Sequence, residues 1–353
     1  MSQLFGEYVN DYEEIHFSES IHDKHIYKAF NTKENRDVSL KLLKKEEYKG
    51  KDSLFEKMKK EFNILTLCKS ENILNGYRYF ETENNVVLEQ EYYETNLREY
   101  LMDNGPCDYN QEFFKEIFVG VVKALKTLHE KGIIHRNIRT SHIFLAPNES
   151  SRGENLIKLG EFGTAIYAKE NKSEPLNSIF YTAPEIVNGE EYNEKCDLWS
   201  FAIALYEIYF GQMPFGSKPV RSSVIRAISE EGNFQIKKTN LPSLDLLFEG
   251  LLKINPKQRL SHEQLFKLVF DYNFMEENEN EEFNRIYEQY MNDNKSADIK
   301  LNVNNDNINI ENNYSKFKEE TQNKKIEEFS NKIIILAYII FIVIIYFICR
   351  FIY

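Results

Sequence analysis

The sequence predicts an α+β protein with two unlike lobes, followed by a disordered polar linker and an apolar C-terminal helix. Residues from about 10 to 92 alternate short β-rich runs with one helical stretch, whereas helical periodicity dominates from about 93 to 272. Residues 273–332 are rich in Asn and Glu and lack sustained periodicity, and residues 333–353 are almost wholly apolar. We therefore expect a small β-rich N-terminal lobe and a larger helical C-terminal lobe.

Composition limits the class of protein. The chain of 353 residues is 42% hydrophobic and 14% aromatic, which suffices for a substantial core. Its formal charge of -12 argues against nucleic acid as a partner. The four cysteines, Cys68, Cys107, Cys196 and Cys349, are far apart and form no C-x-x-C pair. Neither a zinc site nor a disulfide framework is expected, and we infer a reducing, cytosolic environment for the main body.

The strands of the first lobe are predicted from HIYKAF, residues 25–30, and DVSLKLL, residues 37–43. The stretch LFEKMKKEFNILTLC, residues 54–68, has helical spacing and places Glu61 on the apolar face. A carboxylate on that face needs a cation, because an unpaired buried charge is costly. Lys41, on a strand between apolar neighbours, is the natural partner, and two ordinary surface charges are the alternative.

Two helices are predicted in the second lobe. The first has apolar residues every three or four positions, at Phe114, Ile117, Val121, Leu125 and Leu128. The second, DLWSFAIALYEIYFG, residues 197–211, is hydrophobic on nearly all sides and is expected to end at its glycine. This pattern is typical of a helix buried at the centre of a large lobe. NESSRGEN, residues 148–155, is interpreted as an expanded turn between two short strands.

The polar linker contains one aromatic and aliphatic cluster, at Phe283, Ile286, Tyr287 and Tyr290. A short docking helix is one interpretation of its spacing. A transient local cluster is the favoured one, because the surrounding segment has the composition of a disordered chain.

The C-terminal segment is predicted to cross a membrane. IIILAYIIFIVIIYFIC, residues 333–349, carries no charge, and about 20 apolar residues in a helix span a bilayer. A core helix or strand is the alternative, but a segment beyond a polar linker has no core to enter. Three lysines precede the segment and one arginine follows it, at Lys324, Lys325, Lys332 and Arg350. This bias predicts a single-pass C-terminal anchor with the main domain facing the cytosol.

Short motifs follow one another in a characteristic order along residues 10–272. They are VSLK at 38–41, HRNIRTSHIFL at 135–145, LGEFG at 159–163, YTAPE at 181–185, DLWSFA at 197–202 and NPKQRLS at 255–261. The series resembles the eukaryotic protein kinases, whose pattern includes V-A-I-K, H-R-D-L-x-x-x-N, D-F-G and A-P-E. The resemblance implies a bilobal kinase-like fold, ATP as cofactor, and a protein substrate or protein partners.

The resemblance also implies individual roles. The cofactor-binding candidates are Lys41, Glu61, Ile26, Ser39 and Glu161. The structural candidates are Arg136, Phe162, Gly163, Glu185, Asp197 and Arg259. Among these, Glu185 and Arg259 resemble the buried ion pair that braces the activation segment, and Asp197 would brace the catalytic loop from beneath. For Ile26 and Ser39, an adenine-sized slot and a plain strand core are equally favoured.

Three positions depart from the kinase pattern where the chemistry occurs. Asn137 stands at the catalytic carboxylate, and a neutral amide cannot accept a proton, whereas a positioned base contributes about 10² to 10⁴ in rate. His142 stands at the metal-binding asparagine, although Mg²⁺ prefers oxygen ligands, so a loop hydrogen bond is its favoured role. Glu161 replaces the metal-binding aspartate and adds a methylene group. We expect Mg²⁺ to be held weakly or not at all.

The nucleotide lid departs as well, because Glu19, Ile21 and Lys24 stand where G-x-G-x-x-G has its glycines. Side chains there hinder the approach of backbone N–H groups to phosphates, and Glu19 adds repulsion. Arg139 stands at the position of the catalytic-loop lysine and retains a positive charge directed at phosphate. Either Glu89 or Glu91 opens the connection between the lobes.

Arg136 is a candidate for holding a phosphorylated residue of the activation segment, at Thr164, Ser173 or Ser178. An unmodified, solvated loop is the alternative. Three functions are compatible with the whole pattern. A membrane-anchored pseudokinase that acts as scaffold or allosteric regulator is favoured over an active, divergent serine/threonine kinase. An adaptor that binds no nucleotide is the third interpretation.

Overall fold

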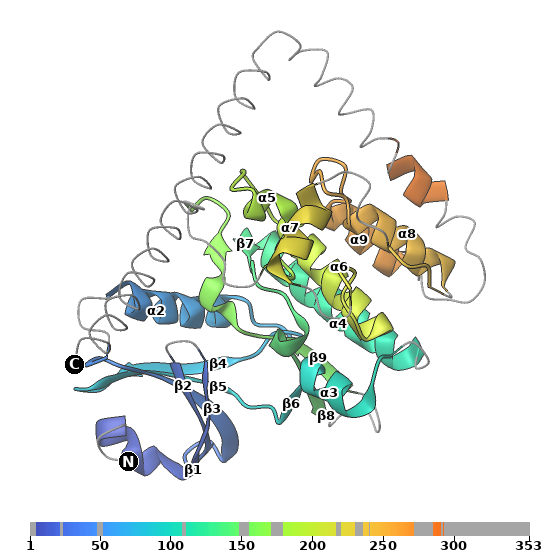
Figure 1. Cartoon of the computed structure of the whole chain (residues 1–353). Coiled ribbons are helices and arrows are strands. Elements are labelled where there is room, and N and C mark those ends of the chain that lie inside the picture. The colour runs from blue at the N-terminus through green and yellow to red at the C-terminus, as the bar shows by residue number, and fades with distance from the viewer. Residues whose placement is uncertain are drawn as a thin grey trace, which may run out of the picture. The chain divides into compact units, whose positions relative to one another are not determined.

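A five-stranded antiparallel sheet in the order β1-β2-β3-β5-β4 organises the first lobe of the computed structural model (Figure 1). Its strands are β1 (Tyr12–Ile21), β2 (Lys24–Asn31), β3 (Arg36–Lys44), β4 (Gly76–Glu81) and β5 (Asn85–Glu91). The structure describes residues 5–21, 24–47, 52–107, 111–147, 155–170, 179–216, 220–229, 236–239, 241–271, 285–290 and 292. The β-rich N-terminal lobe that the sequence predicts is therefore confirmed.

Strand β3 is buried on both faces, because each face of the sheet is covered. On one face, Val38 and Leu40 join an apolar cluster that Phe5 and the 3₁₀ helix η1 (Gly6–Asp11) complete. On the other face lies α2 (Asp52–Leu67), the predicted helix, whose Glu61 is 1% exposed. The alternation of side chains along a strand thus sends Lys41 toward α2 while its neighbours fill the outer cluster.

The second lobe is mainly helical. Its elements are β6 (Thr95–Asn96), α3 (Leu97–Asn104), α4 (Gln111–Glu130), β7 (Ile133–Ile134), η2 (Thr140–His142), β8 (Ile143–Pro147), β9 (Asn155–Leu159), η3 (Phe162–Thr164), β10 (Ile166–Tyr167), α5 (Pro184–Val187), α6 (Lys195–Phe210), α7 (Arg221–Ser229), α8 (Pro242–Leu251) and α9 (His262–Asp271). The five periodic residues of α4 are all buried, and β8 pairs with β9 on either side of the predicted turn. Most of that turn, residues 148–154, lies outside the described residues.

Helix α6 is buried on nearly all sides, as its composition predicts. Trp199 and Phe201 are fully buried, and so are most of their neighbours along the helix. The helix ends at Gly211, whose φ of 66° lies in the left-handed region that glycine adopts without a Cβ clash. This central helix carries Asp197 in its first turn and so fixes the base of the functional site.

Residues 285–290 form a helical turn that packs on the second lobe, so the favoured interpretation as a transient cluster is wrong. Ile286 and Tyr287 are 7% and 3% exposed and belong to the main apolar core. The ring of Tyr287 lies close to Gly250 of α8, where an added Cβ would come within 3.1 Å of Cε2. The absence of a side chain at Gly250 leaves room for this ring.

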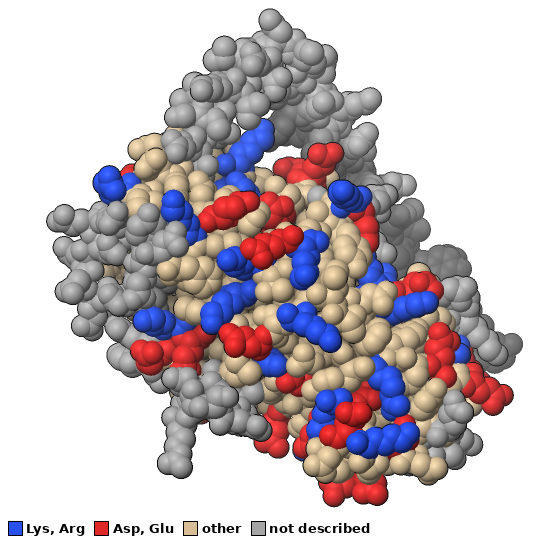
Figure 2. All heavy atoms as spheres, turned by 180° about the vertical axis from the view of Figure 1, so that it is seen from behind, with Lys and Arg blue, Asp and Glu red and all other residues tan. Residues whose placement is uncertain are grey.

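The segment predicted to cross a membrane, residues 333–353, lies outside the described residues. Among the described helices, none combines the length and the apolar content that a bilayer span requires. On the face of the molecule that Figure 2 shows, basic and acidic side chains are interspersed among the described residues.

Candidate functional site

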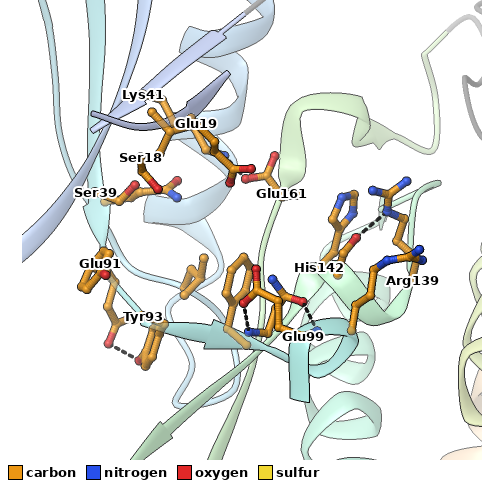
Figure 3. A pocket seen from close by; sticks show the side chains of 18 of the residues that line it. Ser18, Glu19, Ser39, Lys41, Glu91, Tyr93, Glu99, Arg139, His142 and Glu161 are labelled. Atoms are coloured by element: carbon orange, nitrogen blue, oxygen red, sulfur yellow. Dashed lines mark hydrogen bonds and ion pairs between the residues drawn. The ribbon is translucent and has the colours of Figure 1, made fainter. Parts of the chain in front are cut away.

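A cavity of about 400 Å³ lies between the two lobes and is lined by six of the eight predicted catalytic, cofactor-binding and metal residues, the other two being Asn137 and Glu61. Its lining comes from the lid strands, the connection between the lobes, α3, the loop after β7 and the start of η3 (Figure 3). The predicted residues in the lining are Ile26, Ser39, Lys41, Arg139, His142 and Glu161. Ile26 and Ser39 thus face the cavity and are not plain strand core.

One part of the cavity is apolar and is bordered by the connection between the lobes. Leu74 and Phe144 line it together with Ile26, and Tyr92 and Tyr93 follow the end of β5. This combination of apolar walls and adjoining backbone suits a flat heteroaromatic ring.

The positions of the Glu89 and Glu91 side chains decide which of these two residues begins the connection between the lobes. Glu89 faces the outer side of the sheet and accepts hydrogen bonds from the Tyr12 hydroxyl at 2.6 Å and the Asn31 amide at 2.8 Å. Glu91 ends β5 and lines the cavity. The connection therefore opens at Glu91.

Glu91 is braced by groups that the sequence analysis missed. Both of its carboxylate oxygens accept hydrogen bonds from Lys158 Nζ, at 2.9 and 2.8 Å, and Tyr93 Oη donates another at 2.5 Å. Burial and the bond to Glu91 together raise the pKa of Tyr93, which keeps its hydroxyl protonated as a donor. Lys158 lies 67 residues from Glu91, so no local sequence signal announces the pair.

Lys41 is held by two carboxylates at the polar end of the cavity. Its Nζ lies 2.7 Å from Glu61 Oε1 and 2.5 Å from Glu161 Oε1, and its side chain is 1% exposed. Burial alone would lower the pKa of Lys41, but the charges of Glu161 and Glu61 outweigh burial and raise it. The predicted pair with Glu61 is confirmed, and the additional partner is the residue at the metal position.

Lys24 is the second cation on Glu61, and the sequence analysis did not predict this contact. Its Nζ lies 2.8 Å from Glu61 Oε2, while Lys41 occupies Oε1. Burial raises the pKa of Glu61, but the charges of Lys24 and Lys41 overcome that effect and lower it. The residue that replaces a lid glycine therefore ties the lid to α2.

The loop after β7 is held from below by Asp197, as predicted. Its two oxygens accept hydrogen bonds from the backbone N–H groups of His135 and Arg136, both at 2.8 Å, and it lies 3.0 Å from His129 Nε2. Arg136 has a φ of 66°, a left-handed conformation that costs about 1–3 kcal/mol in a residue other than glycine. The hydrogen bonds to Asp197 hold this conformation in place.

The guanidinium of Arg136 already has partners in this structure. Its Nε donates to the carbonyl of Thr164 at 2.6 Å, and its Nη1 donates to the hydroxyl of Tyr192 at 3.1 Å. Ser173 and Ser178, two of the candidate phosphorylation sites, lie outside the described residues.

His142 forms a hydrogen bond within the loop, which is the role favoured from the sequence. Its Nδ1 donates to the backbone carbonyl of Asn137 at 2.8 Å. Burial lowers the pKa of His142 to about 3, against the opposing charge of Glu161, so the imidazole is neutral at physiological pH. Asn137 stands at the position of the catalytic carboxylate. The backbone just before it is fixed by the hydrogen bonds from the N–H groups of His135 and Arg136 to Asp197.

The two predicted metal positions carry an imidazole and a carboxylate, at His142 and Glu161. His142 offers nitrogen, whereas Mg²⁺ prefers oxygen ligands. Glu161 offers two carboxylate oxygens, and one of them, Oε1, is in contact with the Lys41 ammonium group. Within the described ranges, no group of three or more His, Cys, Asp or Glu side chains is arranged to hold a metal ion. Glu161 itself has a φ of 63°, which places it with Arg136 among the left-handed residues of the site.

The remaining cavity charges come from Arg139 and Glu19. Arg139 Nε donates to Ser141 Oγ at 2.7 Å, and its side chain lines the cavity near His142 (Figure 3). Glu19 reaches in from the lid toward Glu161. Burial and the charge of Glu161 raise the pKa of Glu19.

The predicted structural residues take their expected places. Arg259 Nη1 and Nη2 donate to the two oxygens of Glu185 at 2.7 and 2.9 Å, and both side chains are fully buried. Phe162 is 1% exposed and packs edge-on against His135, with ring centroids 4.8 Å apart. Gly163 leaves room for the tip of Lys24, because an added Cβ would lie 2.9 Å from Nζ.

Comparison with known proteins agrees with these features. The family model described as "Protein kinase domain" matches residues 24–270. The chain is 30% identical over 244 residues to an Aurora kinase of Schizosaccharomyces pombe, which covers 69% of this chain and 66% of the relative. It is 29% identical over 249 residues to the serine/threonine-protein kinase ULK1 of Homo sapiens, and this match covers 67% of this chain and 23% of the relative. The matched region is thus only part of each relative's length.

Proposed function

Because the chain belongs to the protein kinase family, we propose that it is a catalytically impaired member that binds ATP and serves protein partners as a scaffold or allosteric regulator. The observation that carries this proposal is Asn137 on an otherwise ordered catalytic loop. The backbone around it is anchored by Asp197, so an amide occupies the place where the family has its proton acceptor. Loss of a positioned base removes about 10² to 10⁴ in rate.

The cavity supports ATP binding. Its volume of about 400 Å³ lies within the range of small-molecule sites, about 300–1,000 Å³. Ile26, Leu74 and Phe144 would hold the adenine ring, and Lys41 and Arg139 would face the phosphates. Bound ATP would supply a γ-phosphoryl group at that end of the cavity, but the residue at the family's proton-acceptor position, Asn137, is an amide. We infer that binding without Mg²⁺ is the relevant mode, because the metal positions lack a suitable set of oxygen ligands.

An active, divergent serine/threonine kinase is the second candidate. The intact Lys41–Glu61 pair at 2.7 Å favours it, because the family requires this pair for productive nucleotide binding. The intact Glu185–Arg259 pair favours it too. Neither pair replaces the missing base, so both are equally compatible with a nucleotide-binding regulator.

Membrane anchoring is part of the proposal and rests on the composition of residues 333–353. We propose a single-pass C-terminal anchor with the kinase domain facing the cytosol. Flotation with liposomes tests it: the full chain should float, and a chain truncated after residue 332 should remain at the bottom. Equal behaviour of the two chains would contradict the anchor.

Nucleotide titration tests the function most simply. The melting temperature of the full chain is measured against ATP concentration in EDTA, in Mg²⁺ and in Mn²⁺, because a ligand that binds only the folded state raises it. The proposal predicts a shift of similar size in all three buffers. A shift that requires metal would favour the active kinase, and the absence of any shift would favour an adaptor that binds no nucleotide.

A further inference from the structure

We propose that Lys24 is a polyphosphate-binding residue, which supplies a second ammonium group beside Lys41 and so takes over part of the charge neutralisation that a metal ion would provide. This inference rests on the proposed ATP binding and names a residue of that same site. It is carried by the convergence of both lysines on one carboxylate, Glu61.

Lys24 is not one of the lining residues of the cavity in this structure, but its ammonium group shares Glu61 with Lys41, which does line it. Lys24 is the first residue of β2, and Ile26 on the same face of the strand lines the cavity. Its Nζ lies beside Gly163 and 2.8 Å from Glu61 Oε2. The charge of Lys24 also acts on Glu161, whose pKa it lowers together with Lys41.

The two lysines differ in how many donors they retain for a ligand. Lys41 is 1% exposed and already serves two carboxylates, whereas Lys24 is 22% exposed and makes its described ion pair with Glu61. An ammonium group has three donors, so Lys24 keeps more of them for an incoming anion. Lys24 also keeps the fully buried Glu61 neutralised when Lys41 is drawn toward a phosphate, since an unpaired buried carboxylate is costly.

The electrostatic need for a second cation is visible at the same place. Glu19 and Glu161 present carboxylates to the cavity, and a triphosphate adds further negative charge. Lys24 and Lys41 together balance Glu61 and Glu161. One lysine alone would leave an excess of negative charge before any phosphate arrives.

The test measures equilibrium binding of ATP and of adenosine to the full chain in EDTA, by isothermal titration calorimetry. The variants are Lys24→Met, Lys24→Arg and Lys33→Met, with the wild type. Lys33 is a matched control, because its ion pair in the same lobe is with Asp11, at 2.7 Å, and not with the Glu61 that Lys24 and Lys41 share. Adenosine has no phosphates, so its affinity reports whether the slot is still folded.

Lys24→Met is expected to weaken ATP binding by about tenfold or more, the scale of one charge-assisted contact, with adenosine binding unchanged. Lys24→Arg should retain most of the affinity, and Lys33→Met should match the wild type. Wild-type ATP affinity in Lys24→Met would overturn the assignment while leaving ATP binding itself intact. An equal loss for ATP and adenosine would overturn it in favour of a purely structural role. Failure of the wild type to bind ATP would overturn both this inference and the proposed function.

Discussion

Glu161 Oε1 lies 2.5 Å from Lys41 Nζ, so the residue at the metal position holds the buried cation of the cavity. In the kinase pattern, that lysine pairs the nucleotide phosphates and the acidic residue binds Mg²⁺. Here the two groups neutralise each other. A polyphosphate would therefore compete with a carboxylate for Lys41, and we expect this competition to lower its affinity.

Glu161→Gln should strengthen ATP binding in EDTA, by roughly tenfold or about 1.4 kcal/mol. The substitution keeps the shape of the side chain, removes a negative charge beside the phosphates and replaces the ion pair with Lys41 by a weaker, neutral acceptor. Calorimetric titration measures the change. Glu81→Gln is the control, because Glu81 lies at the end of β4, pairs with Lys45 and does not line the cavity. Equal or weaker ATP binding in Glu161→Gln would show that Glu161 does not compete.

Breaking the buried Glu185–Arg259 pair on one side should destabilise the protein by about 3–5 kcal/mol. Both side chains are fully buried, so Glu185→Gln leaves the Arg259 guanidinium without its counter-charge. Urea unfolding measures the free energy. The double variant Glu185→Leu, Arg259→Met should lose much less stability than the sum of the losses in the single variants Glu185→Leu and Arg259→Met, and strict additivity would contradict the coupling.

The pKa of about 3 for His142 predicts a loss of stability in acid. The unfolded chain binds a proton near its ordinary pKa of about 6.5, whereas the folded chain binds it only near 3. The contribution of His142 to the free energy of unfolding is therefore fully present above about pH 6.5, and it falls by about 1.4 kcal/mol for each pH unit below that value. His142→Asn should reduce this acid dependence, measured as the free energy of unfolding at pH 7.5 and pH 5. An unchanged difference between those two pH values, with the exposed His16→Asn as control, would contradict the assignment.

The elements with strong periodicity were predictable from the sequence. The apolar spacing that ends in Leu125 and Leu128 gives α4, and Lys41 with Glu61 gives the buried pair, because each follows from local side-chain direction. Motif order adds the long-range pair of Glu185 with Arg259. These contacts were found because the residue types and their spacing leave few physical alternatives.

The contacts that the sequence did not reveal join residues of ordinary type. From the sequence, Lys24 is a residue that replaces a lid glycine. The structure adds that its ammonium group contacts Glu61 Oε2, while Lys41 contacts Oε1. Lys158 and Glu91 lie on strands far apart along the chain. An ion pair between distant segments depends on tertiary placement, which neither composition nor periodicity encodes.

Tyr287→Ala should test the corrected view of the segment after α9. Tyr287 is 3% exposed and fits beside Gly250, so its truncation should cost roughly 2–4 kcal/mol. The same variant should expose residues 285–290 to limited proteolysis. Glu288→Ala, at an exposed position of the same turn, is the control. Wild-type stability and protease resistance in Tyr287→Ala would contradict a docked turn.

The most direct measurement is phosphate transfer from labelled ATP to a generic protein substrate by the full chain. Three proteins are compared in Mg²⁺: the wild type, the Lys41→Met variant, and one triple variant that combines Asn137→Asp, His142→Asn and Glu161→Asp. An amide at position 137 cannot accept the proton, so the wild type should transfer no more phosphate than Lys41→Met. The triple variant, with its acid and oxygen ligands restored, should exceed both. Transfer by the wild type that Lys41→Met abolishes would contradict the account.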